Sequence, residues 1–306
     1  MVSPNDGLRL PPSWISPAAG MPDREVRPVI IVQRRRLLYP AYVQDYLDRV
    51  TAADVAAGNT SGLEVGVTDG ANTFIQDLVN DGLLGVSGGV ISQAASVMKA
   101  SVPMAGARTR LGAMTPLVGP APTSFNFGNN DYNRKTGLVG DGNAMYLNSN
   151  RNTNADPQDS LHQAVWVSVA QTNTNTQAYI GAGAAAPGST QINYGAGTAT
   201  FEFRNRVNSP PITGGSVNSV GLIAQSRNGA TSVATRINGT TTFTNIASQV
   251  PHSGDALVFA RNSGANAAGL WCNARLPFYS IGESLDLAIL DARVTALISA
   301  YAAAIP

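Results

Sequence analysis

The residues that could do chemistry in this sequence are few, and three consecutive arginines stand out first. Arg34, Arg35 and Arg36 lie side by side in "VQRRRLLYP", in a chain whose net charge is only +1. A guanidinium pairs bidentately with carboxylates and with phosphates. The triplet could therefore contact an acidic groove on a protein partner, contact nucleic acid, or form a solvated basic turn. Because the chain has no general attraction for nucleic acid, we expect the acidic protein partner.

Residues for catalysis are harder to find. The two histidines, His162 in "SLHQAVW" and His252 in "VPHSGD", are not at metal-ligand spacing, and no G-x-S-x-G elbow accompanies them. Glycoside hydrolysis needs two neighbouring carboxylates. The best strand for such a pair, "TATFEFRNRV", offers Glu202 alone. We therefore expect no enzyme, no catalytic residue, no bound metal and no cofactor.

Other polar and reactive groups have simple structural interpretations. Asp131 in "GNNDYN" and Asp141 in "VGDGNAMYL" sit in turn-like sequences, where Asp bonds to nearby backbone groups. A Ca²⁺ site built with loop carbonyls is the alternative. Cys272 is the single cysteine, so it cannot form a disulfide within the chain, and we expect it to be a small buried residue.

Aromatic side chains matter because sugar rings stack on exposed ones. Trp166 and Phe259 alternate with polar neighbours as core residues do. Tyr132, Tyr179 and Tyr194 come near loop-like sequences, and we take them as the candidates for contact with a glycan.

The composition favours a surface that is covered by neighbours. Charged residues make up 13% of the 306 residues, about half of the usual share. Neutral polar residues are common instead, and burying an amide costs much less than burying an unpaired charge. We therefore expect a homo-oligomer. No signal peptide and no apolar run near the ~20 residues of a bilayer span are visible, so we expect no membrane insertion.

Residues 1–40 are predicted to be an extended anchoring arm. They contain seven prolines, which disfavour helix and central strand. Within the arm, Val29, Ile30, Ile31 and Val32 form a β-branched run that could add a strand to the sheet edge of a partner.

Residues 41–120 are predicted to be a helical region. Apolar residues recur on one face of 41–58 and of 69–84, where Thr68 or Asp69 could cap the second helix. A weaker third helix is expected at 90–101.

Residues 121–282 show short alternating runs broken by Gly and Asn, which indicate an antiparallel β-sandwich. The dipeptides Asn228-Gly229 and Asn238-Gly239 predict two type I′ hairpins and thus a three-stranded meander.

Residues 283–306 are predicted to be a C-terminal helix, with Ser280 and Glu283 as a capping box. One face carries apolar residues at spacings of three and four: Leu287, Leu290, Val294, Leu297 and Tyr301. This face could lie on the domain's own surface or form a symmetric helix contact between subunits.

The sequence also resembles a known group of proteins. "YLN" at 146–148, "VWVSVAQ", "RINGT" and the ending "SIGESLDLAILDARVTALISAYAAAI" resemble tailed-bacteriophage virion proteins with a laminin-G or concanavalin-like β-sandwich. The resemblance covers about residues 41–306 and excludes the arm. It implies a mainly β fold and a tail- or baseplate-associated component of the virion, assembled in the host cytoplasm. It implies no catalytic residues.

We therefore expect a structural protein of a tailed phage, anchored by its arm to other virion proteins. One alternative is a receptor-binding protein that holds host glycan, and another is a capsid decoration or cement protein. A depolymerase would need the carboxylate pair that the sequence does not offer.

Overall fold

The computed structural model describes residues 39–172, 174–184, 186–208, 211–216, 218–264 and 267–306. Residues 39–306 form one compact unit. The arginine triplet at 34–36 and the β-branched run at 29–32 lie outside the described residues, so their anchoring role stays a prediction.

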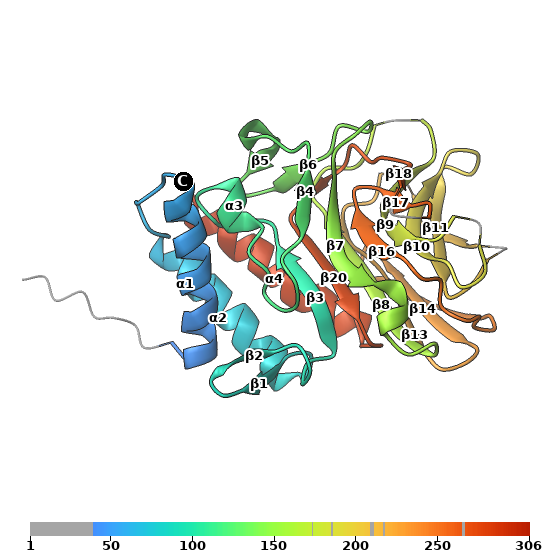
Figure 1. Ribbon diagram of the computed structural model, residues 1–306, viewed down its shortest axis with the longest axis horizontal. Coiled ribbons are helices and arrows are strands. Elements are labelled where there is room, and N and C mark those ends of the chain that lie inside the picture. Colours follow the sequence, from blue (N-terminus) through green and yellow to red (C-terminus); the bar gives the residue numbers. More distant parts are fainter. Residues whose placement is uncertain (1–38, 173, 185, 209–210, 217, 265–266) are drawn as a thin grey trace, which may run out of the picture. The chain divides into compact units, whose positions relative to one another are not determined.

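The described unit is built from two large, mainly antiparallel sheets and a layer of helices (Figure 1). The nine-stranded sheet runs in the order β12 (Ile212–Gly214), β11 (Thr200–Asn205), β10 (Thr190–Gly195), β9 (Gln177–Ala182), β16 (Asp255–Val258), β7 (Tyr146–Asn152) and β4 (Thr123–Phe125). The short strands β17 (Arg261–Asn262) and β18 (Ala268–Gly269) join it beside β9. The six-stranded sheet runs in the order β15 (Thr240–Asn245), β14 (Ser232–Ile237), β13 (Gly221–Asn228), β8 (Ser160–Val167), β20 (Phe278–Gly282) and β3 (Met98–Pro103).

The remaining elements lie around these sheets. The helices are α1 (Ala41–Ala56), α2 (Val65–Asn80), α3 (Arg110–Ala113) and α4 (Leu287–Ala304), with 3₁₀ turns η1 (Asn129–Asp131) and η2 (Thr153–Ala155). Two small sheets pair β1 (Gly85–Ser87) with β2 (Val90–Ser92), and β6 (Gly137–Val139) with β5 (Tyr132–Asn133) and β19 (Arg275–Leu276).

Alternation along the strands explains the layers. Val165 of β8 pairs with Ile223 of β13, and both side chains lie in the core between the two sheets. The next residue, Trp166, pairs with Leu222, and these side chains pack on the helices instead. The six-stranded sheet is therefore apolar on both faces, and the helices cover the face that the other sheet leaves open. The predicted fold class is confirmed: a mainly β, antiparallel sandwich with helices before it and a C-terminal helix.

The boundary expected at residue 120 is wrong, because the sheet begins earlier in the chain. Residues 90–101, expected to be a helix, form β2 and most of β3, and β3 pairs with β20. Ala100 and Val102, two residues apart, both face the core between the sheets. Since Met, Ala and Lys favour helices, tertiary pairing overrides local preference in this segment.

One of the two predicted hairpin turns is confirmed. Asn238 and Gly239 have φ of 46° and 78°, as a type I′ turn requires. The turn at Asn228-Gly229 is wider, because β14 begins only at Ser232. The buried guanidinium of Arg227 explains the wider loop, since its Nη1 donates to the carbonyl oxygens of Gly229 and Ala230. The three-stranded meander β13–β14–β15 is nevertheless present.

The C-terminal helix begins later than predicted and is capped by another residue. Ser280 lies in β20, and Asp286 caps α4, its Oδ1 accepting from the backbone N–H of Ala288 at 2.7 Å. The predicted capping box is therefore wrong. The whole apolar stripe of α4 is buried in the chain's own core: Leu287, Leu290, Val294, Leu297 and Tyr301. The prediction that this stripe forms a contact between subunits is thus wrong. The alternative prediction, that the helix packs on the chain's own domain, is confirmed.

Among the described residues, α4 is the one helix long and apolar enough, by length and composition, to cross a membrane. It packs against α2, β13 and β14 in the structure. This packing buries one face of the helix, which carries Leu287, Leu290, Val294, Leu297, Ile298 and Tyr301.

Candidate functional site

His162, one of the two histidines considered for catalysis, has a structural role. His162 is buried, its Nδ1–H donates to the carbonyl oxygen of Glu283 at 2.6 Å, and its Nε2 accepts from Ser280 Oγ at 2.8 Å. Burial lowers its pKa to about 4, although the bond to Glu283 opposes the shift. His162 is therefore a neutral, satisfied core residue. In the part of the chain that the structure describes, no group of three or more His, Cys, Asp or Glu side chains could hold a metal ion.

The two turn aspartates and the cysteine lie as predicted. Asp141 Oδ1 accepts from the backbone N–H of Asn143, Ala144 and Met145 at 2.8–2.9 Å. Burial raises the pKa of Asp141, but these N–H groups outweigh burial and lower it overall. Asp131 Oδ2 accepts from the Gly128 N–H at 2.7 Å. Cys272 is buried, which raises its pKa to about 12.

Two of the three tyrosines expected to contact a glycan, Tyr179 and Tyr194, are buried, and the prediction is wrong for them. Tyr179 and Tyr194 lie within β9 and β10 with their rings in the core between the sheets. The hydroxyl of Tyr132 donates to the carbonyl oxygen of Ala107 at 2.8 Å, and its ring packs against the core. Polar neighbours such as Gln177 and Asn193 make the sequence around Tyr179 and Tyr194 resemble a loop. In the structure these neighbours are themselves buried.

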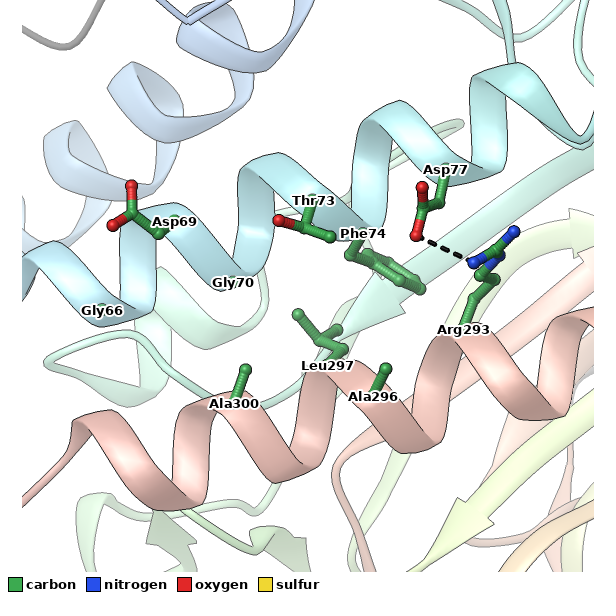
Figure 2. Close-up of a pocket in the computed structure, with 10 residues that line it drawn as sticks. All are labelled: Gly66, Asp69, Gly70, Thr73, Phe74, Asp77, Arg293, Ala296, Leu297 and Ala300. Carbon is green, nitrogen blue, oxygen red and sulfur yellow. Dashed lines mark hydrogen bonds and ion pairs between the residues drawn. The ribbon is translucent and has the colours of Figure 1, made fainter.

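A groove between α2 and α4 is the first surface feature to consider (Figure 2). It has a volume of about 280 Å³, and Figure 2 shows Phe74 and Leu297 lining it between the two helices. One end holds the ion pair of Arg293 Nη1 with Asp77 Oδ2 at 2.9 Å. Small residues on facing sides, Gly70 and Ala300, account for the groove. Its two carboxylates are already engaged, because Asp77 pairs with Arg293 and Asp69 accepts from the Tyr39 hydroxyl.

The outermost strand of the six-stranded sheet, β15, is the better candidate. β15 pairs with β14 along one side, and no described strand pairs with its other side. Its sequence, "TTTFTN", contains no charge and no proline. Phe243 at its centre is 72% exposed. We call this strand the β15 edge.

Both faces of the β15 edge border a hollow. On the inner face, a cleft of about 430 Å³ lies between β15, β14 and β12, with Thr240, Thr242 and Thr244 on one wall and Ile212 and Ile237 among its apolar residues. We call it the inner cleft. On the outer face, a second cleft of about 260 Å³ lies beside Phe243 and the start of α4, and includes Leu285 and Asp286. We call it the outer cleft.

An edge strand presents unpaired backbone N–H and C=O groups that can template another strand. Natural edges are usually protected by charge, proline, a bulge or a cover. The described part of the β15 edge has no such protection along its six residues. Alternate side chains of an added strand would enter the inner cleft or lie over the outer cleft. The arrangement therefore suits strand addition, and its hydroxyls and apolar groups suit binding more than catalysis.

The sequence identified this strand but not its place in the sheet. "TTTFTNIA" reads plainly as a strand. Its position at the edge depends on pairings with β14 and β13 and on the distant strands β8 and β20. The uncharged run "TTTFT" is the feature of the sequence that could indicate an unprotected edge, since natural edge strands usually carry charge.

Comparisons with known proteins give distant structural similarity only. No family model and no curated protein matches the sequence. A sialidase from Trypanosoma rangeli has a TM-score of 0.44 and 10% identity, over 74% of this chain and 39% of that one. The binding domain of botulinum neurotoxin serotype D has a TM-score of 0.44 and 12% identity, over 65% and 50%. A sialidase from Streptococcus pneumoniae has a TM-score of 0.34 and 10% identity, over 44% and 24%.

This chain therefore spans half or less of the length of each of these three structures. None of the three is described as a phage protein, so the resemblance to virion proteins stays a prediction.

Proposed function

We propose that the protein is a non-enzymatic structural component of a tailed-phage particle, anchored by residues 1–40 and displaying its β-sandwich. The observation that carries the proposal is the unprotected β15 edge. A β-branched segment that is predicted to be extended is a suitable donor for strand addition, and an open sheet edge is a suitable acceptor. In this proposal, Val29–Val32 of one copy add to the β15 edge of a neighbouring copy.

The clefts fit the side chains of such a donor strand. Along an added strand, Val29 and Ile31 point to one face of the sheet, and Ile30 and Val32 to the other. One pair meets Ile212 and Ile237 in the inner cleft, and the other pair covers Phe243. Each fully buried aliphatic side chain contributes about 1.5–3 kcal/mol before the cost of ordering the arm is subtracted.

The charges are compatible with this contact. The β15 edge itself is neutral, so it does not repel the arm. Asp286 lines the outer cleft, and its Oδ1 caps α4, so its other carboxylate oxygen, Oδ2, is the one that can accept from an arginine. An arginine that follows the donor segment, one of Arg34 to Arg36, can pair with it. This gives the arginine triplet an acidic partner on another copy of the chain.

Sedimentation of the purified full-length chain tests the contact. We expect the wild type to self-associate, and Phe243→Lys to shift it to monomer because a lysine blocks pairing at an edge. Ile31→Lys should do the same from the donor side. Val169→Lys is the matched control: Val169 is 51% exposed and does not line either cleft, so its variant should associate like the wild type.

A wild type that stays monomeric at high concentration contradicts the proposed contact, as does a Phe243→Lys variant that associates normally. The role in the particle is tested separately by cryo-electron microscopy of intact phage particles from the source of the sequence. Density for the chain against tail or baseplate proteins supports the proposal. Density on the shell supports the cement-protein alternative, and absence of the chain from the particles contradicts both.

A further inference from the structure

A pocket lined by three arginines lies away from the β15 edge. It has a volume of about 290 Å³, and its side chains come from the loop before α3, from α3 and from the β5–β6 region: Arg108, Thr109, Arg110, Asn129, Tyr132 and Arg134. We call it the arginine pocket.

Two of the arginines are held in place by one carboxylate. Arg134 Nη1 donates to Glu64 Oε1 at 2.9 Å, and its Nη2 pairs with Glu64 Oε2 at 2.5 Å. Arg108 Nη1 lies 2.8 Å from Glu64 Oε1. The bond from Arg134 lowers the pKa of Glu64, although partial burial opposes it. Further bonds, from Arg108 Nε to the Gly62 carbonyl and from Arg134 Nε to the Ala107 carbonyl, engage most donors of these two arginines. The two arginines therefore contribute fixed positive charge to the pocket and leave the pairing with a ligand to Arg110.

The third arginine has no carboxylate partner among the described residues. Arg110 Nη1 donates to Ser124 Oγ at 3.2 Å, and its buried Nε has no hydrogen-bond partner. The second nearby carboxylate, Asp54, is already occupied. Its Oδ2 accepts from the Arg108 N–H, and its Oδ1 accepts from the N–H and the hydroxyl of Thr109.

The charges leave the arginine pocket positive. Arg108, Arg110 and Arg134 contribute three positive charges, whereas Glu64 and Asp54 contribute two negative ones. A buried guanidinium nitrogen without a partner costs free energy. An oxyanion beside the accessible part of the Arg110 guanidinium balances the excess charge and so offsets this cost.

We propose that the arginine pocket binds the carboxylate of an acidic sugar. Arginine pairs with planar carboxylates through two parallel hydrogen bonds. Asn129 provides a neutral amide that suits a sugar hydroxyl, and the bond from Tyr132 to Ala107 holds the aromatic ring in the lining of the pocket. The volume suits about one sugar ring and is at the small end of ligand pockets. The proposal depends on a different surface from the β15 edge, so either can fail alone.

Titration calorimetry on the full-length chain tests the pocket with glucuronic acid and N-acetylneuraminic acid as probes. We expect saturable binding of at least one, and at least tenfold weaker binding of glucose, because a charge-assisted pair contributes about 1.5–3 kcal/mol. Arg110→Gln should weaken binding at least tenfold. Since Arg110 forms no ion pair in the described structure, this variant should keep its fold, which circular dichroism checks.

Lys135→Gln is the matched control. It removes a positive charge from the residue next to Arg134, and Lys135 does not line the pocket. We expect Lys135→Gln to bind the acidic sugars within about twofold of the wild type. This result would mean that a specific contact with Arg110, and not general electrostatic attraction, holds the sugar. Equal affinity for glucose, or unchanged binding by Arg110→Gln, overturns the proposal. Inorganic phosphate that binds as tightly as both acidic sugars also overturns it, since the pocket is then a general anion site.

Discussion

A histidine buried in a sheet without a charged partner makes stability depend on pH. His162 is fully buried, and burial lowers its pKa from 6.5 to about 4. The unfolded chain therefore takes up a proton below pH 6.5, whereas the folded chain takes it up only near pH 4. The stability that this group contributes is fully present above pH 6.5 and is lost as the pH falls toward 4.

We expect the free energy of unfolding to be about 2 kcal/mol lower at pH 5 than at pH 7 because of His162. Urea unfolding at the two pH values measures the difference. The carboxylates whose pKa is lowered, such as Glu64 and Asp81, lose their contributions at more acidic pH. A His162→Gln variant serves as the control. If it shows the same pH dependence as the wild type, another group is responsible.

Residue roles could be predicted where they depend on local chemistry. Asp141 in its turn and the buried Cys272 follow from their neighbours in sequence. The burial of Tyr179 and Tyr194 could not be predicted from the sequence. Their polar neighbours suggest an exposed loop, but these neighbours are themselves buried. The arginine pocket could not be predicted either, since Glu64, Arg110 and Arg134 are distant in sequence and meet only through the fold.

At the scale of elements, the close contact of α2 with α4 depends on small residues. A Cβ on Gly70 would lie 3.0 Å from Ala300 Cβ and 3.6 Å from the Tyr301 ring. Gly70→Val should therefore destabilise the protein by about 1–3 kcal/mol, the usual cost of overpacking. Thermal and urea unfolding measure the change.

Thr73→Val is the control for this substitution. It places the same valine side chain about one turn further along α2, at an exposed position. Valine has nearly the same shape as the threonine that it replaces. We expect a change within about 0.5 kcal/mol, as for most surface substitutions. Equal effects of the two variants would mean that valine in the helix, and not contact with α4, causes the loss.

Periodic apolar faces predicted α1, α2 and α4, and alternation predicted most strands, because each pattern reflects one buried face. The residues at which helices begin were harder to predict from the sequence. Ser280 and Glu283 fit a capping box by type and spacing, but pairing of β20 with β8 extends the strand through Gly282. The edge position of β15 likewise depends on the order of strands, which no local pattern contains.

At the scale of the whole molecule, the helices and the six-stranded sheet share one apolar core. The ring of Phe74 on α2 meets that of Phe278 on β20 edge-on, with centroids 6.3 Å apart. Trp166 on β8 packs toward the helices, and its Nε1 lies 3.5 Å from Thr295 Oγ1 on α4. The six-stranded sheet thus provides one wall of each of two cores, so loss of either layer exposes apolar surface of the other.

We therefore expect residues 41–120 and the sandwich to unfold together. The far-ultraviolet signal of the helices and the fluorescence of the tryptophans, including Trp166 between sheet and helices, should give one coincident transition in urea. Truncation after Asp286 removes α4 and exposes the buried surface beneath Leu290 and Val294, so the shortened chain should lose cooperative unfolding altogether. Two separate transitions in the full chain, or a shortened chain that still unfolds cooperatively, would instead mean that the sandwich is stable without its helical cover.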